Sequence, residues 1–146
     1  MKNVVILFRC LVDRFFCQGH AELKKRHAKD QLGEDGEKLA SQFLRAGGYK
    51  IIATNVRFSI GEIDIVAQLE KTIVFIEVKT RRSAQYCHPL EVVDKKKRRK
   101  IKQMAKQYYC NKKYASKGFI MRFDIITLIW SEGEQPKIEH FVDTFR

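Results

Sequence analysis

Acidic residues and a lysine stand inside two stretches of strand-like apolar sequence. The first is Gly61-Glu62-Ile63-Asp64-Ile65-Val66, and the second contains Glu77-Val78-Lys79. Ionised groups in such sequence are costly unless they are paired, exposed or bound to metal. The rest of the chain is strongly basic, and the formal net charge is +12 at pH 7. A concentrated acidic site in a basic protein suggests a divalent metal ion that acts on a polyanion.

Hydrolysis of a phosphodiester would suit these residue types. That reaction needs an oriented water molecule, a metal ion that lowers the pKa of the water, and positive charge near the phosphate. Asp64 and Glu77 could supply metal ligands, with the main-chain carbonyl of Val78 beside them. Lys79 could orient the water or stabilise the transition state. Glu37, from a predicted helix upstream, could complete the metal sphere directly or through water.

A β-hairpin would bring the two acidic stretches together. Residues 62–69 and 72–79 are rich in apolar and β-branched side chains, which predicts two strands joined by a turn at Glu70-Lys71. Directly opposed Cβ atoms lie about 5 Å apart, a gap that suits Mg²⁺ or Mn²⁺ between two carboxylates. A slip of one residue would separate the groups. The predicted pairs are Leu69 with Thr72, Val66 with Phe75, Asp64 with Glu77, and Glu62 with Lys79.

Alternation of side chains gives the predicted hairpin two different faces. One face carries the charged groups, and the other is apolar enough to be a core face. The charged face contains Glu62, Asp64, Glu77 and Lys79. The core face is predicted to contain Ile63, Ile65, Ala67, Val74, Ile76 and Val78.

The remaining elements form one α/β domain around this hairpin. The length of 146 residues suits a single domain, which we place at residues 30–146. One helix is predicted over residues 32–46 and ends at Gly47-Gly48. A second long helix is predicted over residues 91–110. Its apolar stripe consists of Val93, Ile101, Met104, Ala105 and Tyr108. The order of helices and strands predicts a mixed sheet flanked by helices. The other predicted strands are Lys50 to Phe58, Ile120 to Ile129 and a short edge strand from Ile138 to Val142.

Residues 1–29 are predicted to be an amphipathic helix followed by a basic linker. Apolar side chains recur with a period of 3.6 over residues 3–17. The first interpretation is that this helix packs on the domain or on a second copy of the chain. The alternative is a helix that lies on a membrane surface, because Lys2, Arg9 and Arg14 lie off the apolar stripe.

A run of cations opens the second predicted helix. A lysine-rich helix in isolation is usually a solvated face, but next to a candidate nuclease site it favours contact with phosphates. Such contacts position a protein on nucleic acid without reading the base sequence, and they make binding depend strongly on salt. The candidate phosphate-binding residues are Arg81, Arg82, Lys95, Lys96, Lys97, Arg98, Arg99 and Lys100.

Several classes of protein are disfavoured by the sequence. Its four cysteines show no Cys-x-x-Cys spacing, so neither a zinc site nor a disulfide framework is expected. No apolar run reaches the length of about 18 residues that a membrane span needs. The apolar start Val4-Val5-Ile6-Leu7-Phe8 is interrupted by Arg9, which argues against a signal peptide. We therefore expect a cytoplasmic protein with free thiols.

The motifs taken in order resemble the PD-(D/E)XK nuclease superfamily. Within it the chain is most similar to the YraN family of bacterial proteins, which is related to archaeal Holliday-junction resolvases. The resemblance implies a restriction-endonuclease-like fold, with Glu37, Asp64 and Glu77 as metal-binding acids and Lys79 as the catalytic lysine. It also implies a homodimer, since a four-way junction needs two symmetric cuts. It is carried by Gly33-Glu34-Asp35-Gly36-Glu37, Ala40, Leu44, Gly48-Tyr49, Asn55, Arg57, Gly61 to Asp64, Phe75 to Arg81 and Arg122-Phe123-Asp124.

Two functions follow from this sequence. The first is a Mg²⁺- or Mn²⁺-dependent endonuclease that hydrolyses DNA, with branched or junction DNA as a candidate substrate. The alternative is a non-catalytic nucleic-acid-binding protein that retains the nuclease fold.

Overall fold

The computed structural model describes residues 28–81, 93–130 and 135–145. The predicted helix 3–17, the basic linker and Arg82 lie outside these residues. Each predicted helix and strand within them is present, with ends that differ by a few residues. The elements are α1 (Ala28–Ala46), β1 (Lys50–Phe58), β2 (Gly61–Leu69), β3 (Thr72–Arg81), α3 (Lys95–Asn111), the 3₁₀ helix η1 (Ala115–Lys117), β4 (Ile120–Ile129) and β5 (Lys137–Phe141).

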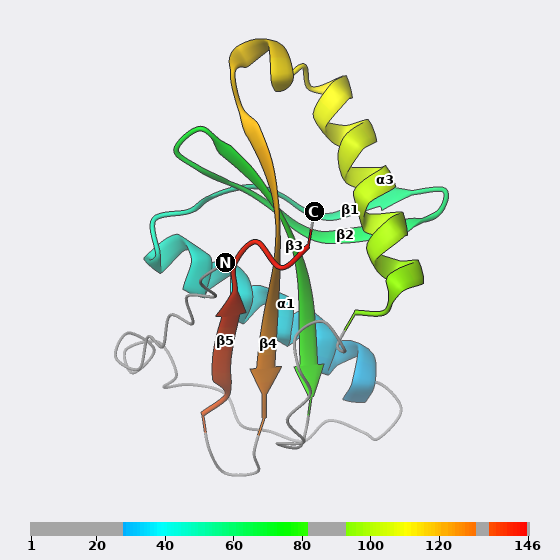
Figure 1. Ribbon diagram of the computed structural model, residues 1–146. Helices are drawn as coiled ribbons and strands as arrows, with labels where there is room; N and C mark the ends of the chain where they lie inside the picture. The colour runs from blue at the N-terminus through cyan, green and yellow to red at the C-terminus, as the bar shows by residue number, and fades with distance from the viewer. Residues whose placement is uncertain (1–27, 82–92, 131–134, 146) are drawn as a thin grey trace.

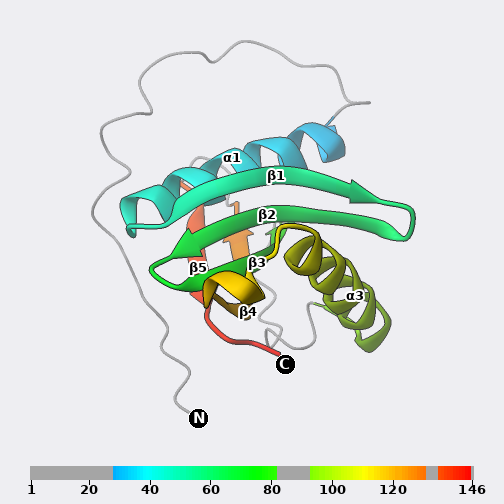
Figure 2. The same cartoon turned by 90° about the horizontal axis from the view of Figure 1, so that it is seen from above.

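The five strands form one mixed sheet in the order β1-β2-β3-β4-β5. The β3–β4 pair is parallel, and the other neighbouring pairs are antiparallel. α1 covers one face of the sheet and α3 covers the other (Figures 1 and 2). The prediction of an α/β domain with a mixed sheet flanked by helices is confirmed, and the arrangement is consistent with a restriction-endonuclease-like fold.

The sheet separates two apolar cores. The core under α3 includes Val66, Phe75 and Met104, and the core under α1 includes Leu44, Ile76 and Ile126. In the regular part of the sheet, alternate residues of each strand therefore contribute to opposite cores, as the pleat requires. Both faces of the sheet are buried, which explains why the sequence of β3 is an almost continuous run of apolar residues.

Capping residues set the ends of the helices that matter for the site. α1 stops at the predicted glycines, where Gly48 has φ 84° and the N–H of Tyr49 donates to the carbonyl of Leu44 at 3.0 Å. α3 begins later than predicted, because Asp94 is its N-cap and accepts a hydrogen bond of 2.6 Å from the N–H of Lys97. This cap fixes which cations of the basic run face the sheet.

The register of the β2–β3 hairpin agrees with the prediction only as far as Ile65 and Ile76. Leu69 pairs with Thr72 and Val66 pairs with Phe75, as a two-residue turn requires. The ladder ends at the Ile65–Ile76 pair, so the predicted pairs beyond it do not form. Glu62 is instead paired with Arg57 of β1. Beyond Ile65, β2 thus follows β1 and leaves the β3 ladder.

The predicted core face of the hairpin is wrong at Ile63. Ile65 and Ala67 pack under α1, but Ile63 packs with Val66 under α3. The alternation of sides is thus interrupted at Asp64. On the neighbouring strand β1, Asn55 has φ 52°, in the left-handed region, and lies between the partners of Ile65 and Ile63. This left-handed residue of β1 thus lies beside the point where β2 leaves β3.

Candidate functional site

Asp64 lies where β2 leaves β3. Its side chain is 7% exposed, and its Oδ2 accepts a hydrogen bond of 2.7 Å from the backbone N–H of Val78. A side-chain oxygen thus takes the place of a strand carbonyl at the end of the ladder. The hydrogen bond holds the carboxylate of β2 against β3, beside the residue that follows Glu77.

The environment of Asp64 disfavours its ionised form. Burial raises the pKa of Asp64, and the nearby negative charge of Glu77 raises it further. The hydrogen bond from Val78 and the positive charges of Lys97 and Lys79 act in the opposite direction but are weaker, so the pKa rises from 3.8 to about 7. The site therefore holds two neighbouring acidic groups that repel each other when both are charged.

Glu77 is the more deeply buried of the two acids, at 2% exposed. Its Oε1 forms an ion pair of 2.5 Å with Nζ of Lys79, which lies on the same side of β3. The same oxygen also contacts Nζ of Lys97, which comes from α3. A single carboxylate oxygen is thus shared by two ammonium groups from different elements.

Lys97 was predicted only as a phosphate-binding residue, and its contact with Glu77 was missed. A signal was present, since Lys97 lies four residues from both Val93 and Ile101 and so falls on the apolar stripe of its helix. Burial lowers the pKa of Lys97, but its contacts with Glu77 outweigh burial and leave the pKa raised. Lys97 therefore remains an ammonium group in this site.

Glu37 reaches the site from α1, on the other side of the sheet. Burial raises the pKa of its carboxyl, the side-chain hydrogen bond from Asn55 lowers it, and the negative charges of Glu62, Glu34 and Glu77 raise it, with a net rise. Glu37 therefore faces the acidic side of the cluster. Its interaction with Glu77 is electrostatic, and no direct contact joins the two carboxyls among the described residues.

A close packing of α1 on β3 places Glu37. A Cβ atom built on Gly36 would stand 2.0 Å from Oγ1 of Thr80, the residue that follows Lys79. Only glycine allows the helix to approach the strand so closely. Asn55 also contributes, because it combines a left-handed backbone with the hydrogen bond to Glu37. In the sequence, Asn55 stands out as a strand-disfavouring residue inside an apolar strand and as one of the residues that carry the family resemblance.

The other predicted phosphate-binding residues are distributed unevenly. Arg81 is half-buried at the end of β3, and Arg98 is half-buried on α3. Each of these two residues is therefore less available to a ligand than the fully exposed cations. The exposed members of the run are Lys95, Lys96, Arg99 and Lys100.

Thr127 adds an unexpected hydroxyl next to Lys79. Thr127 pairs with Lys79 across the β3–β4 ladder and so points to the same side of the sheet. It is 7% exposed, and its Oγ1 has no hydrogen-bond partner among the described residues. A buried hydroxyl without a partner is uncommon in folded proteins.

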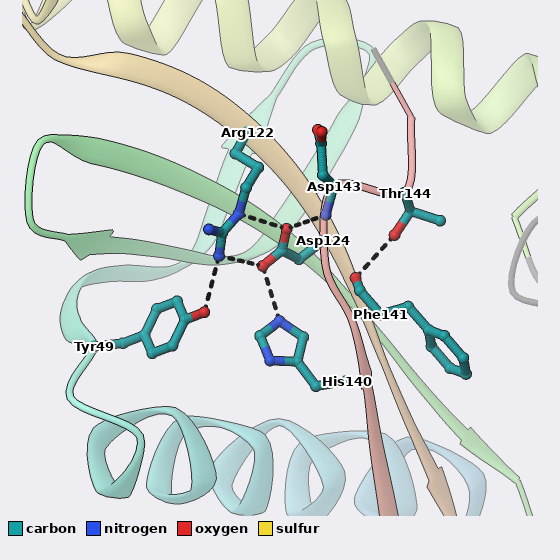
Figure 3. Close-up of polar contacts among 7 residues, drawn as sticks. All are labelled: Tyr49, Arg122, Asp124, His140, Phe141, Asp143 and Thr144. Carbon is teal, nitrogen blue, oxygen red and sulfur yellow. Dashed lines mark hydrogen bonds and ion pairs between the residues drawn. The ribbon is translucent and has the colours of Figure 1, made fainter. Parts of the chain in front are cut away.

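A second polar cluster surrounds Asp124 of β4 (Figure 3). Oδ1 of Asp124 accepts from Nε of Arg122 at 2.9 Å and from the N–H of Asp143 at 3.0 Å. Oδ2 accepts from Nη2 of Arg122 at 2.8 Å and lies 2.8 Å from Nε2 of His140. Arg122 also donates to the hydroxyl of Tyr49 at 2.8 Å. Because both oxygens are fully used, this cluster ties β5 and the α1–β1 connection to β4 and offers no place for a ligand.

The two clusters differ in what they could bind. Asp64 and Glu77 are buried carboxylates of adjoining strands, and Mg²⁺ is commonly held by one or two carboxylates together with water and substrate phosphate. Burial and, to a smaller extent, repulsion from Glu77 raise the pKa of Asp64, and a cation bound beside it would oppose both effects. Within residues 28–81, 93–130 and 135–145, no group of three or more His, Cys, Asp and Glu side chains is arranged to hold a metal ion. The donor set that fits is therefore the pair of carboxylates.

None of the helices in the described part of the chain combines the length and the apolar character needed to cross a membrane.

Comparison with known proteins places the motifs in one family. The sequence model described as "Uncharacterised protein family UPF0102" matches residues 36–128. A UPF0102 protein of Alkaliphilus oremlandii is 39% identical over 115 residues, which cover 79% of this chain and 97% of the relative. One from Caldicellulosiruptor bescii is 41% identical over 116 residues, with the same coverage of 79% and 97%. One from Symbiobacterium thermophilum is 45% identical over 96 residues, covering 66% and 80%.

Proposed function

The chain belongs to the uncharacterised protein family UPF0102, the YraN family to which its motifs pointed, and from that premise we propose that it is a metal-dependent endonuclease acting on DNA. The family description names no activity, so the proposal rests on the residues of this chain. One observation carries the proposal. The buried carboxylates of Asp64 and Glu77 come from two diverging strands and lie together, and the ammonium group of Lys79 contacts Glu77.

The residues support a division of roles at a phosphodiester. Asp64 and Glu77 would hold Mg²⁺ or Mn²⁺, with the carbonyl of Val78 as a further oxygen ligand. When bound, such an ion polarises a phosphate oxygen and lowers the pKa of a water molecule. Lys79 is anchored at Glu77 and would stabilise the charge that develops on the phosphate. Glu37 would act from a greater distance, through water.

The charge of the chain supports a polyanionic substrate. The exposed cations at the start of α3 belong to the same helix as Lys97, which contacts Glu77. A phosphate chain bound along this helix would therefore run close to the carboxylates. Contacts of this kind favour the shape of the nucleic acid over its base sequence. Branched DNA is the candidate substrate within that class.

Cleavage of labelled linear and four-way-junction DNA in Mg²⁺ or Mn²⁺ tests the proposal. Wild type should produce metal-dependent fragments, and Asp64→Ala and Glu77→Ala should not. Glu70→Ala is the matched control, because Glu70 is an exposed acid in the turn of the same hairpin. Absence of cleavage by wild type, or equal cleavage by the two site variants, would overturn the enzyme proposal.

A binding protein without turnover is the second candidate. It is favoured by the contacts of Oε1 of Glu77, which is already shared by two ammonium groups. This candidate predicts DNA affinity with a steep salt dependence and no fragments at any metal concentration.

Light scattering of the protein alone and with junction DNA would test the homodimer that a symmetric junction cut requires.

A further inference from the structure

The position of Lys97 has a consequence for metal binding that depends on the metal site proposed above. Glu77 is buried, and its Oε1 is already in contact with Nζ of Lys97 and Nζ of Lys79. A hard cation that binds this oxygen meets two positive charges at its binding position. Withdrawal of one ammonium group would relieve this repulsion and free Oε1 for the ion.

The two lysines are not equally able to withdraw. Lys79 lies two residues from Glu77 on the same face of β3, so its ammonium group stays close to the carboxylate. Lys97 comes from α3, and its side chain is 39% exposed against 30% for Lys79. Its long flexible stem allows the ammonium group to turn outward, toward water or a bound phosphate, without movement of the helix.

We propose that Lys97 is a displaceable counter-ion of Glu77: it occupies the metal position in the metal-free protein and is released toward the phosphate chain when a divalent ion binds. The exchange couples the two ligands of the site. A phosphate that attracts Lys97 frees Glu77 for the metal, and a metal on Glu77 frees Lys97 for the phosphate. By linkage, each ligand should strengthen the binding of the other by the same factor.

Mn²⁺ titration of purified protein, followed by electron paramagnetic resonance of the free ion, tests the exchange without nucleic acid. Lys97→Met removes the competing charge and keeps an unbranched side chain, so it should bind Mn²⁺ about tenfold more tightly than wild type. Lys96→Met is the matched control, since Lys96 is the exposed neighbour on the same helix, and its affinity should stay within about twofold of wild type. Equal or weaker Mn²⁺ binding by Lys97→Met would overturn the inference.

A measurement on wild type removes any dependence on the folding of a variant. Lysine acylation followed by peptide mass spectrometry reports how accessible each ammonium group is. Mn²⁺ should increase the acylation rate of Lys97 several-fold and leave that of Lys96 unchanged. A rate for Lys97 that does not respond to bound Mn²⁺ would contradict the exchange. If Mn²⁺ binds to neither wild type nor variant, the proposed metal-dependent function itself is wrong. If Mn²⁺ binds but Lys97 does not respond, only the exchange is wrong.

Discussion

The carboxylate of Asp64 accepts a hydrogen bond of 2.7 Å from the backbone N–H of Val78. Asp64 lies one residue before Ile65, and Val78 two residues after Ile76, in the last ladder pair of β2 and β3. The side chain of Asp64 therefore bridges β2 and β3 at the point where the two strands separate. This hydrogen bond also fixes the carboxylate of β2 next to Glu77 of β3. The geometry of the candidate site and the end of the ladder are thus one feature.

Replacement of Asp64 by asparagine should stabilise the protein at neutral pH. A carboxyl whose pKa is raised to about 7 on folding binds its proton more tightly in the folded state, so its contribution to stability falls as the pH rises from about 4 to 7. Asp64→Asn cannot ionise and keeps an oxygen acceptor for Val78. We expect it to be about 1–3 kcal/mol more stable than wild type at pH 8, and equal to it near pH 4.

Urea unfolding in a chelator at the two pH values measures this difference. Glu70→Gln in the exposed turn is the control and should leave the free energy of unfolding unchanged at both. A destabilised Asp64→Asn at pH 8 would show that the ionised carboxylate is favourable in the metal-free protein, against this account.

Replacement of Gly36 by alanine should be destabilising, although alanine is usually the better helix former. The new Cβ would stand 2.0 Å from Oγ1 of Thr80, which forces α1 away from β3 at an expected cost of about 1–3 kcal/mol. The Thr80→Ala background removes that oxygen and leaves Cβ of residue 80 at 3.2 Å, so the same change should cost less there. Thermal unfolding of the four proteins of this cycle measures the coupling, and strictly additive effects would rule out the clash.

Removal of Arg122 should weaken the fold and shift its acid unfolding. Arg122→Met leaves Asp124 charged and fully buried without its main partner, at an expected cost of about 3 kcal/mol. Burial raises the pKa of Asp124, but hydrogen bonds from His140 and Arg122 outweigh burial and lower it below 3.8. The stability that this carboxylate contributes is thus present above pH 3.8 and is lost as the pH falls below it.

Circular dichroism during an acid titration should therefore show the unfolding midpoint of Arg122→Met at a higher pH than that of wild type. Tyr49→Phe deletes a single hydrogen bond to Arg122 and should cost about 1 kcal/mol. Equal costs for the two variants would mean that Arg122 acts mainly through Tyr49.

Replacement of Thr127 by valine should leave stability unchanged or raise it by up to about 1 kcal/mol. Valine has nearly the same shape, and the hydroxyl that it replaces is buried without a partner among the described residues. Chemical unfolding of Thr127→Val measures the effect. A loss of more than about 1 kcal/mol would reveal a hydrogen bond to Oγ1 from some other part of the chain or from water.

Neutral replacement of an exposed cation of α3 should weaken DNA binding in a salt-dependent way. Each of Lys96→Gln and Lys100→Gln should reduce the slope of log affinity against log salt by about one unit if the residue contacts a phosphate of duplex DNA. Fluorescence anisotropy between about 50 and 200 mM salt measures the slope. Lys117→Gln, in η1, is the control outside the helix. Unchanged slopes for both α3 variants would remove α3 from the interface.

The sequence was a good guide to elements whose pattern is regular. β1 and β4 have the predicted limits, and the turn at Glu70-Lys71 sets the predicted register for Val66 and Phe75. Prediction from the sequence failed where the regular pattern of residues stops. The alternation of residues does not indicate that β2 and β3 separate beyond the Ile65–Ile76 pair. At that point a side chain, that of Asp64, binds the N–H of Val78, and Asn55 has a left-handed backbone.

Prediction of the candidate site was limited in the same way. Asp64, Glu77 and Lys79 could be proposed from residue type and spacing alone, since all three lie in one hairpin. Lys97 could not be separated from its five cationic neighbours until Asp94 fixed the start of α3. A predicted N-cap at Asp94, combined with the four-residue spacings from Val93 to Lys97 and from Lys97 to Ile101, would have been enough to select it.

The parallel pairing of β3 with β4 means that the chain must cross over through α3 before the second half of the sheet can form. The acids belong to a hairpin and become neighbours by short-range contacts, whereas Lys97 arrives only with the crossover. Until α3 docks, the acids have only Lys79 as a counter-charge and face water, where charges interact weakly. The burial of the acids and the arrival of their second counter-charge are therefore one step, the docking of α3.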